Sequence, residues 1–431
     1  MLLIYTPKIT SRFSYIMKHI FNRMLGIEVG FTSTVEDFIK HQGAKFTYAK
    51  LPLQNEFFVR STELLFDQGI NDVKIKMGDW DGTPCFFSAG DKSTIPFDIF
   101  SASFYLLSRY EEYLPHVKDI HGRFPPTESL AFQHQFLQLP VVDLWAKKFL
   151  EILVARFPSL EVRPKKYKYT SVIDVTTSHC YLYKGVIRSI SGIVMDIGTL
   201  KVKRLFERLL VFMRLRKDPY DNFDRLIELH KKFKVQSHFF FQFAAYSTYD
   251  KNVSINNNTF ITLIKSVADY SKVSLAASYT SFGSAAVVLS EKVNLSSVLH
   301  RPINAVRLRY NRVDVPHSYR NLVDAEFTDD FTMGYTHQMG FRAGTCTPFQ
   351  FYDINLEAIQ PVKVHPFAFH DYALQVFKNT REILPQIQQM LSMVKAVNGG
   401  FISVFSNELL GGEKGEEWMR LYENCLKEFH V

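Results

Sequence analysis

The chain has 431 residues, of which 46% are hydrophobic and 22% charged, values that are ordinary for a folded protein of two or three domains. The net charge of +8 favours acidic partners, but no zinc knuckle, Gly-rich phosphate loop or RNA-binding signature accompanies it, so we expect no nucleic-acid partner. Four widely spaced cysteines are typical of reduced thiols, and no apolar run reaches the ~18 residues that a membrane span needs. These properties predict a cytoplasmic protein and leave peripheral contact with the inner membrane open.

The first part of the chain is predicted to form a mixed α/β domain. The expected elements are a helix at residues 10–25, strands at 45–51 and 73–77, and helices at 97–114 and 141–157. Prolines and charged residues then cluster between Phe157 and Lys166. This cluster predicts a boundary between an N-terminal domain of unknown role, residues 1–160, and a second domain, residues 165–431.

In the second part, short apolar strands alternate with helical segments. The expected strands are residues 167–175, 237–243, 273–277, 305–310, 362–369 and 400–405. This alternation predicts a parallel sheet or a barrel, with functional residues at or just after the strand ends.

One segment of the second part, residues 199–217, is a basic amphipathic helix by its pattern. Two interpretations stay open. The helix lies on an anionic membrane surface, or it packs on the sheet and exposes a solvated basic face.

Four motifs lie at the ends of the expected strands. They are residues 171–175 (SVIDV), 340–346 (GFRAGTC), 366–371 (PFAFHD) and 401–408 (FISVFSNE). In this order they resemble the polysaccharide deacetylases of carbohydrate esterase family four, over roughly residues 165–430. The first 160 residues resemble the uncharacterised domain that precedes such barrels in some bacterial proteins, most clearly at 108–112 (SRYEE) and 121–124 (HGRF). The resemblance implies a distorted (β/α) barrel of about seven strands after a smaller mixed α/β domain.

The resemblance also implies a mechanism. In that family one Asp and two His hold a divalent metal, usually zinc, which activates a water, while a second Asp is the general base and a His is the general acid. This sequence departs from the pattern at all three ligand positions, which carry Thr176, Ala276 and Arg309, and at the acid position, which carries Ser406. We therefore expect no metal and no other cofactor; zinc is expected only if the ligands have moved elsewhere.

Three residues of the family's machinery remain, namely Asp174, Arg342 and Asp371. They are the candidate catalytic residues, and two interpretations are open for them: a retained ligand site, or a buried ion-pair network that only supports the strand ends. We also expect Arg309 to pair with Asp174 in place of the metal.

Four residues are candidates for ligand binding. Arg309 is expected to recognise acidic groups, and Tyr279, Tyr310 and Phe341 are expected to stack on a sugar or to be core residues.

Two functions follow from these patterns. The first is a degenerate deacetylase-like module that binds a glycan, a lipid-linked glycan precursor or another protein in envelope polysaccharide metabolism. The alternative is an active N-acetyl sugar deacetylase or hydrolase, with relocated metal ligands or with Asp174 as base. Strand alternation places His365 opposite His370, and His370 opposite its neighbour Asp371, which argues against a relocated site.

Overall fold

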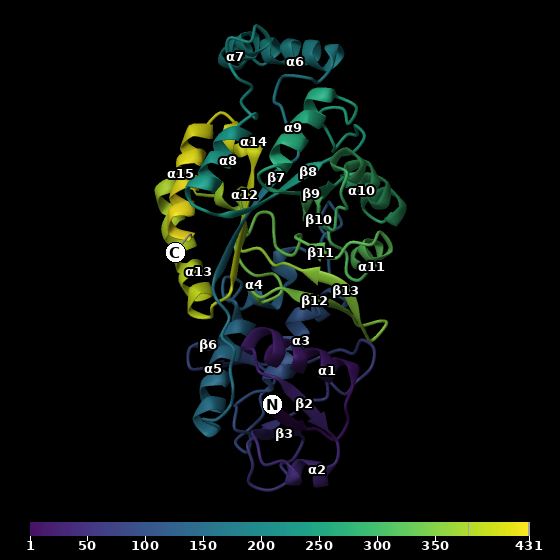
Figure 1. The fold of residues 1–431 in the computed structure, drawn as a ribbon, viewed down its shortest axis with the longest axis vertical. Helices are drawn as coiled ribbons and strands as arrows, with labels where there is room; N and C mark the ends of the chain where they lie inside the picture. Colours follow the sequence, from purple (N-terminus) through teal and green to yellow (C-terminus); the bar gives the residue numbers. More distant parts are fainter. Residues whose placement is uncertain (378, 430–431) are drawn as a thin grey trace.

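The computed structural model describes residues 1–377 and 379–429. Figure 1 shows three levels along the long axis of the molecule: the N-terminal part, a large sheet flanked by helices, and the pair α6 and α7, which projects beyond everything else. Within the described residues, no helix combines the length and apolar character needed to cross a bilayer. All four cysteines are free thiols.

The N-terminal part is built on a four-stranded parallel sheet of order β2-β1-β3-β4. Its strands are β1 (Leu2–Tyr5), β2 (Val29–Thr32), β3 (Lys45–Ala49) and β4 (Phe58–Arg60), followed by the hairpin β5 (Met77–Trp80) and β6 (Thr83–Phe86). Its helices are α1 (Ser11–Met17), α2 (Val35–Lys40), α3 (Ile99–Leu107), α4 (Leu130–Gln133) and α5 (Val141–Arg156).

The helix expected at residues 10–25 is confirmed. The side chain of Thr10 caps α1 by accepting a hydrogen bond from the Phe13 N–H, and the helix continues in π-helical form over Lys18–Leu25. The helix expected at 97–114 is shorter, because α3 ends at Leu107 and Arg109 takes a left-handed backbone conformation with φ of 56°.

The strand expected at residues 73–77 is wrong. Residues 71–76 have no regular structure, and β5 begins at Met77. Val73 and Ile75 do pack against the core, which explains their alternation with exposed lysines. Alternation alone does not make a strand when no neighbouring strand pairs with the chain.

The second part contains a nine-stranded sheet of order β12-β13-β11-β10-β9-β8-β7-β15-β14. Its strands are β7 (Lys168–Val175), β8 (Gln236–Gln242), β9 (Lys272–Ala277), β10 (Ala305–Leu308), β11 (Asp329–Asp330), β12 (Phe349–Asp353), β13 (Ala358–Val364), β14 (Phe369–His370) and β15 (Gly400–Ser406). Its helices are α6 (Val186–Gly198), α7 (Val202–Phe212), α8 (Phe223–Lys232), α9 (Asn258–Ala268), α10 (Ala285–Leu299), α11 (His317–Asp324), α12 (Asp371–Leu374), α13 (Thr380–Ala396), α14 (Asn407–Gly411) and α15 (Gly415–Phe429).

This sheet is parallel except for the β12–β13 pair. It has nine strands rather than about seven, and the described strand pairing leaves it open instead of closing a barrel. The expected strand 362–369 is split between β13 and β14, and the chain between them crosses the opening. There the Phe367 N–H donates to the Met333 carbonyl (3.1 Å) and the Ala368 N–H donates to the Ile402 carbonyl (2.8 Å).

The concave face of this sheet holds a small apolar layer. Its members are Val172, Phe240, Ala276, Ala305, Phe331, Phe367, Ile402 and Val404. Because side chains alternate along a strand, Asp174 lies on the same face as Val172, one level nearer the carboxyl end. The apolar layer thus separates two polar ends: Asp174 and its neighbours at the carboxyl ends, and a second group at the amino ends.

Candidate functional site

Asp174 lies at the end of β7 and contacts two cationic groups. The Nε atom of Arg307, on β10, donates to Oδ2 of Asp174 at 3.1 Å. The Nε2 atom of His370, at the end of β14, lies 3.7 Å from the same oxygen. Each of the three comes from the carboxyl end of a different strand, so the contacts join side chains that are remote in sequence.

His370 and Asp371 act together, against the expectation that they face opposite sides. The Nδ1 atom of His370 lies 2.6 Å from Oδ1 of Asp371. The strand β14 ends at His370, and Asp371 begins α12, so strand alternation no longer applies to the pair. The other oxygen of Asp371 accepts hydrogen bonds from the backbone N–H (2.6 Å) and hydroxyl (2.8 Å) of Ser406.

The charges in this group balance. Burial by itself would raise the pKa of Asp174, but the Arg307 guanidinium and His370 outweigh it and lower the pKa to about 2. Burial would lower the pKa of His370, but Asp371 and Asp174 raise it above its ordinary value. Asp174 is therefore ionised, and His370 holds its proton to a higher pH than an ordinary histidine. The Oδ1 atom of Asp174 is buried without a hydrogen-bond partner among the described residues.

Two predicted site residues lie elsewhere. The Arg342 guanidinium forms a buried bidentate pair with Glu112 of the N-terminal part, at 2.9 and 2.6 Å, and not with Asp174. Arg309 was expected to pair with Asp174; this is wrong, because it donates to the Gln242 side chain and lies 3.7 Å from Asp250. The residue that neutralises Asp174 is Arg307, which lies within β10, whereas Arg309 comes just after the end of that strand.

The four residues that were expected at the family's metal and acid positions make other contacts within the protein. The Thr176 hydroxyl donates to the Glu408 carboxylate, Ala276 belongs to the apolar layer, and the Ser406 hydroxyl donates to Asp371. Within residues 1–377 and 379–429, no three His, Cys, Asp or Glu side chains are grouped as ligands of one ion.

An aromatic group lies on the loops that follow β8, β9 and β10. The Tyr249 and Tyr279 rings stack with centroids 4.1 Å apart, and the Tyr310 ring meets Tyr279 edge-on at 5.2 Å. His121 of the N-terminal part contacts Tyr310, and the Arg312 guanidinium lies 3.9 Å from the Tyr279 centroid. The third predicted stacking residue, Phe341, is 1% exposed and is a core residue.

Hydrogen bonds connect the aromatic group to Asp174. The second branch of the Arg307 guanidinium donates to the Asn311 side chain at 2.7 Å, and the Asn311 amide donates to the Thr336 hydroxyl at 2.9 Å. The Arg123 guanidinium contacts the same hydroxyl at 3.3 Å and donates to the Tyr310 carbonyl at 2.6 Å. The carboxylate and the aromatic rings therefore belong to one connected site.

Near this group of residues lies a cavity of ≈ 440 Å³. Tyr220, Tyr372, Glu408 and Trp418 are among the residues that line it. It adjoins the Asp174 group, because Tyr372 follows Asp371 and Glu408 accepts the hydrogen bond of Thr176. Its volume lies within the range of small-molecule pockets.

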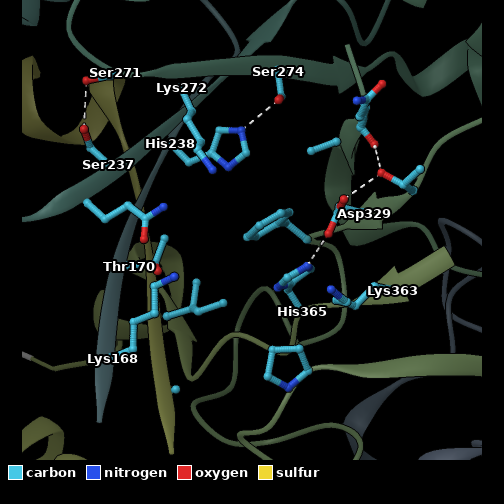
Figure 2. A pocket seen from close by; sticks show the side chains of 18 of the residues that line it. Lys168, Thr170, Ser237, His238, Ser271, Lys272, Ser274, Asp329, Lys363 and His365 are labelled. Atoms are coloured by element: carbon cyan, nitrogen blue, oxygen red, sulfur yellow. Dashed lines mark hydrogen bonds and ion pairs between the residues drawn. The ribbon is translucent and has the colours of Figure 1, made fainter. Parts of the chain in front are cut away.

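A larger cavity, of ≈ 1250 Å³, lies at the amino ends of the strands. Figure 2 shows Lys168, Lys272 and Lys363 around it, on three different strands. His238 donates or accepts a hydrogen bond with Ser274 (2.7 Å), and His365 contacts Asp329 (2.7 Å). None of the predicted site residues lines this cavity.

The sequence alone did not reveal Arg307, His370 as a partner of Asp174, Tyr249 or His121. A signal existed for Arg307: it follows Ala305 by two positions, so it faces the concave side of the sheet. No sequence signal placed His121 here, because it comes from the N-terminal part of the chain.

The chain is similar to a known sequence family in its N-terminal part, and to solved structures at low sequence identity. Residues 2–158 match a family of unknown function, DUF7033. No curated protein matches the chain. A Mycobacterium smegmatis protein named as a polysaccharide deacetylase is 11% identical, with a TM-score of 0.38, over 62% of this chain and 89% of that one.

Two further solved structures are similar to the same extent. A protein from Pseudomonas aeruginosa PAO1, named as a polysaccharide deacetylase, is 12% identical, with a TM-score of 0.38, over 60% of this chain and 83% of that one. The 4-alpha-glucanotransferase of Thermococcus litoralis is 14% identical, with a TM-score of 0.36, over 62% of this chain and 37% of that one. No functional conclusion rests on these likenesses.

Proposed function

We propose that this chain binds a carbohydrate at the carboxyl ends of its large sheet, and that it does not perform metal-dependent deacetylation. The observation that carries the proposal is the state of Asp174, whose carboxylate is neutralised by Arg307 and approached by His370. A general base works best when its pKa lies near the working pH. A carboxylate whose pKa is lowered to about 2 is a weak base and serves as a fixed hydrogen-bond acceptor.

The donors in the site do not fit a divalent metal. A threonine hydroxyl, an alanine methyl and a guanidinium stand where an Asp and two His would be needed. A guanidinium offers only donors and remains charged, so Arg309 repels a cation. The Arg307 guanidinium also occupies one oxygen of Asp174, next to where a metal would be held.

The same site suits a sugar. The unpartnered Oδ1 atom of Asp174 is able to accept a hydrogen bond from a ligand hydroxyl, which would remove the cost of leaving it unpaired. Aromatic rings lie in two places near this group: Tyr249, Tyr279 and Tyr310, which hydrogen bonds connect to Asp174, and the cavity lined by Tyr372 and Trp418. Rings that offer an apolar face beside a polar group match the alternating faces and hydroxyls of a sugar.

One observation favours a second function, metal-independent hydrolysis. His370 has a raised pKa and is therefore a proton donor placed beside Asp174. The lowered pKa of Asp174 weighs against this function, because no strong base then accompanies the acid. Binding without hydrolysis is the simpler assignment. The carbohydrate class includes lipid-linked glycan precursors; a protein partner at the same site is the competing assignment.

Calorimetric titration with N-acetylglucosamine oligomers tests the proposal, combined with elemental analysis and an assay for released acetate. We expect binding that weakens about tenfold in Tyr279→Ala, as expected for losing one stacked ring worth about 1.4 kcal/mol. The matched control is Tyr270→Ala, an exposed tyrosine at the opposite end of the sheet. Stoichiometric metal that is lost on chelation, or acetate release by the purified protein, would overturn the proposal.

A further inference from the structure

The helices α6 and α7 have an inverted arrangement of apolar and charged side chains. In α6 the one described side chain that is buried is Asp196, and in α7 those that are buried are Arg208 and Val211. Asp196 accepts a hydrogen bond from Nε of Arg208 at 2.8 Å, and this ion pair holds the two helices together. Helices of a folded protein normally bury their apolar stripe and expose their charges.

Most of the apolar side chains of this hairpin face outward, Val211 being the buried exception. Of the 28 large apolar side chains that are exposed among the residues described by the structure, 12 lie within residues 186–215. They are Val186, Ile187, Ile190, Val194, Met195, Ile197, Leu200, Val202, Phe206, Leu209, Met213 and Leu215. Ile187 is 82% exposed and Leu200 is 84% exposed, so little of either side chain is shielded from solvent. A concentration of this kind marks a contact surface rather than ordinary scatter.

The charge of the hairpin is strongly positive. Residues 186–217 contain eight Lys and Arg against two acidic residues, Asp196 and Glu207. An apolar face with a basic border is complementary to an anionic bilayer, whose phosphates lie just above its acyl chains. A second copy of the same hairpin would bring like charges together instead.

The hairpin is a projecting insertion with a fixed base. It leaves the sheet after β7, the strand that carries Asp174, and Figure 1 shows it beyond all other elements at the carboxyl end of the sheet. The buried carboxylate of Asp218 accepts hydrogen bonds from the backbone N–H groups of Cys180 (2.7 Å), Tyr181 (2.8 Å) and Leu182 (3.0 Å). The two ends of the insertion are thus tied to each other.

We propose that the α6–α7 hairpin docks on an anionic membrane surface with its apolar face in the lipid. The expected orientation turns the carboxyl ends of the sheet toward the bilayer. The membrane docking does not depend on the proposed carbohydrate binding, but it extends that proposal. A carbohydrate site that faces the bilayer suits a glycan presented at a lipid surface. The structure thereby favours the membrane interpretation of residues 199–217, because most of their large apolar side chains are exposed rather than packed on the sheet.

Co-sedimentation with vesicles tests the docking. The probes are vesicles of phosphatidylcholine with about one third phosphatidylglycerol, and vesicles of phosphatidylcholine alone. We expect the full chain to pellet with the anionic vesicles, less so at high salt, because basic residues near the surface contribute electrostatic attraction that salt screens. The variant Leu200→Glu/Phe206→Glu is expected to lose binding at least tenfold, because it places charge in the apolar face.

The matched control is Ile39→Glu/Leu51→Glu, which adds the same charges at exposed apolar positions of the N-terminal part, at the opposite end of the molecule from the hairpin (Figure 1). It is expected to bind vesicles like the wild type. Circular dichroism checks that both variants are folded. Absence of binding to anionic vesicles, or equal loss in both variants, would overturn the docking. A dimer that Leu200→Glu/Phe206→Glu dissociates, without vesicle binding, would assign the face to a second copy and overturn it as well.

A second observation is independent of the hairpin and concerns the cavity at the amino ends of the strands. Seven cationic side chains line it against two acidic ones, Asp269 and Asp329. The cations are Arg23, Lys165, Lys166, Lys168, Lys272, Arg301 and Lys363. Asp329 contacts His365 at 2.7 Å, and the two carboxylates together offset only two of the seven positive charges. His238, which also lines the cavity, adds no charge at neutral pH, because burial lowers its pKa to about 3.

The cationic side chains lie around the cavity and are not confined to one edge of it. Lys168, Lys272 and Lys363 come from β7, β9 and β13, which are separated in the sheet (Figure 2). Like charges held around one hollow repel each other unless an anion lies between them. A single negative charge would neutralise a small part of the set, whereas a diphosphate carries several charges and accepts bonds from compact ammonium groups on several sides.

We infer that this cavity binds a ligand that carries a diphosphate group. Inorganic pyrophosphate is the probe, and calorimetry is the measurement. The variant Lys168→Gln/Lys272→Gln/Lys363→Gln is expected to lose affinity at least tenfold. The control Lys8→Gln/Lys40→Gln/Lys92→Gln removes the same charge from exposed positions elsewhere and is expected to bind like the wild type. No binding at about 1 mM pyrophosphate, or equal affinity of the two variants, would overturn the inference.

Discussion

Arg307 and Asp174 meet across the concave face of the large sheet, although two strands, β8 and β9, separate their own strands β10 and β7. In a flat sheet two intervening strands would hold the side chains about 14 Å apart. A contact of 3.1 Å therefore requires strong curvature, with side chains that converge at the carboxyl ends. The sheet is thus barrel-like in shape although its strand pairing is open.

The Asp174–Arg307 pair is expected to be strongly coupled. Asp174→Ala leaves a buried guanidinium without its counter-charge, and Arg307→Ala leaves a buried carboxylate with His370 alone. Each change is expected to lower the free energy of unfolding by about 3–5 kcal/mol, and the double variant by clearly less than the sum. Denaturant unfolding of the four proteins measures the coupling. Additive losses would show that the two groups act independently.

The histidines are expected to titrate in opposite directions. The pKa of His370 is raised by Asp371 and Asp174, so its ring should remain protonated above the usual pH range. Burial lowers the pKa of His238 to about 3 and that of His230 to about 4, so both should be neutral at pH 5. Proton–nitrogen correlation spectra across pH 4–9 distinguish the two states. A His370 signal that loses its proton below pH 6 would contradict the balanced charge network.

Glu291 is expected to make stability depend on pH. Burial raises the pKa of Glu291 to about 7, from the ordinary value of 4.5 that it has in the unfolded chain. The folded state therefore holds a proton that the unfolded state has lost, and stability falls as pH rises from 4.5 to 7. Glu291→Gln should remove this fall and stabilise the protein at pH 8 by roughly 1–3 kcal/mol.

Thermal unfolding at pH 5 and pH 8 checks this expectation. Glu36→Gln, at an exposed position of α2, is the control and should leave the pH dependence unchanged. A Glu291→Gln variant that is destabilised at pH 8 would show that the ionised carboxylate is stabilising, through its hydrogen bond from the Ser278 N–H.

Arg342 is expected to matter for stability and not for ligand affinity. Arg342→Lys keeps the charge but loses the two-pronged contact with Glu112, so we expect a loss of about 1–3 kcal/mol in unfolding free energy. Oligosaccharide affinity per folded molecule should match the wild type. Weakened affinity with unchanged stability would instead place Arg342 in the ligand site.

The sequence was sufficient for elements that depend on local patterning. The helix from Ser11 to Leu25 and the main parallel strands follow from periodicity and caps, and Asp174 was placed at a strand end because β7 is a clear apolar run. The partners of Asp174 were not predictable in the same way. Arg307 was passed over for Arg309 because a motif alignment decided which arginine belonged to the site. Strand alternation does not separate two residues two positions apart, and the end of β10 at Leu308 was not predicted.

Other errors had non-local causes. Residues 73–77 alternate because Val73 and Ile75 pack on the core without a neighbouring strand. His370 and Asp371 share a site because the helix α12 begins at Asp371. Arg342 does not contact Asp174 because it pairs with Glu112, which lies 230 positions earlier in the chain. Each case depends on which segment lies next to another in space, and a single sequence does not contain that information.

The apolar layer on the concave face of the sheet has a consequence for how this protein can diversify. Rings such as Phe240 and Phe331 lie between the carboxylates at the carboxyl ends of the strands and the lysines at the amino ends. Apolar side chains provide no hydrogen-bond relay, so a substitution at one end of the strands leaves the hydrogen bonds at the other end intact. The same strands therefore carry two separately mutable recognition surfaces, and descendants of this chain are free to exchange the ligand of one while inheriting the other unchanged.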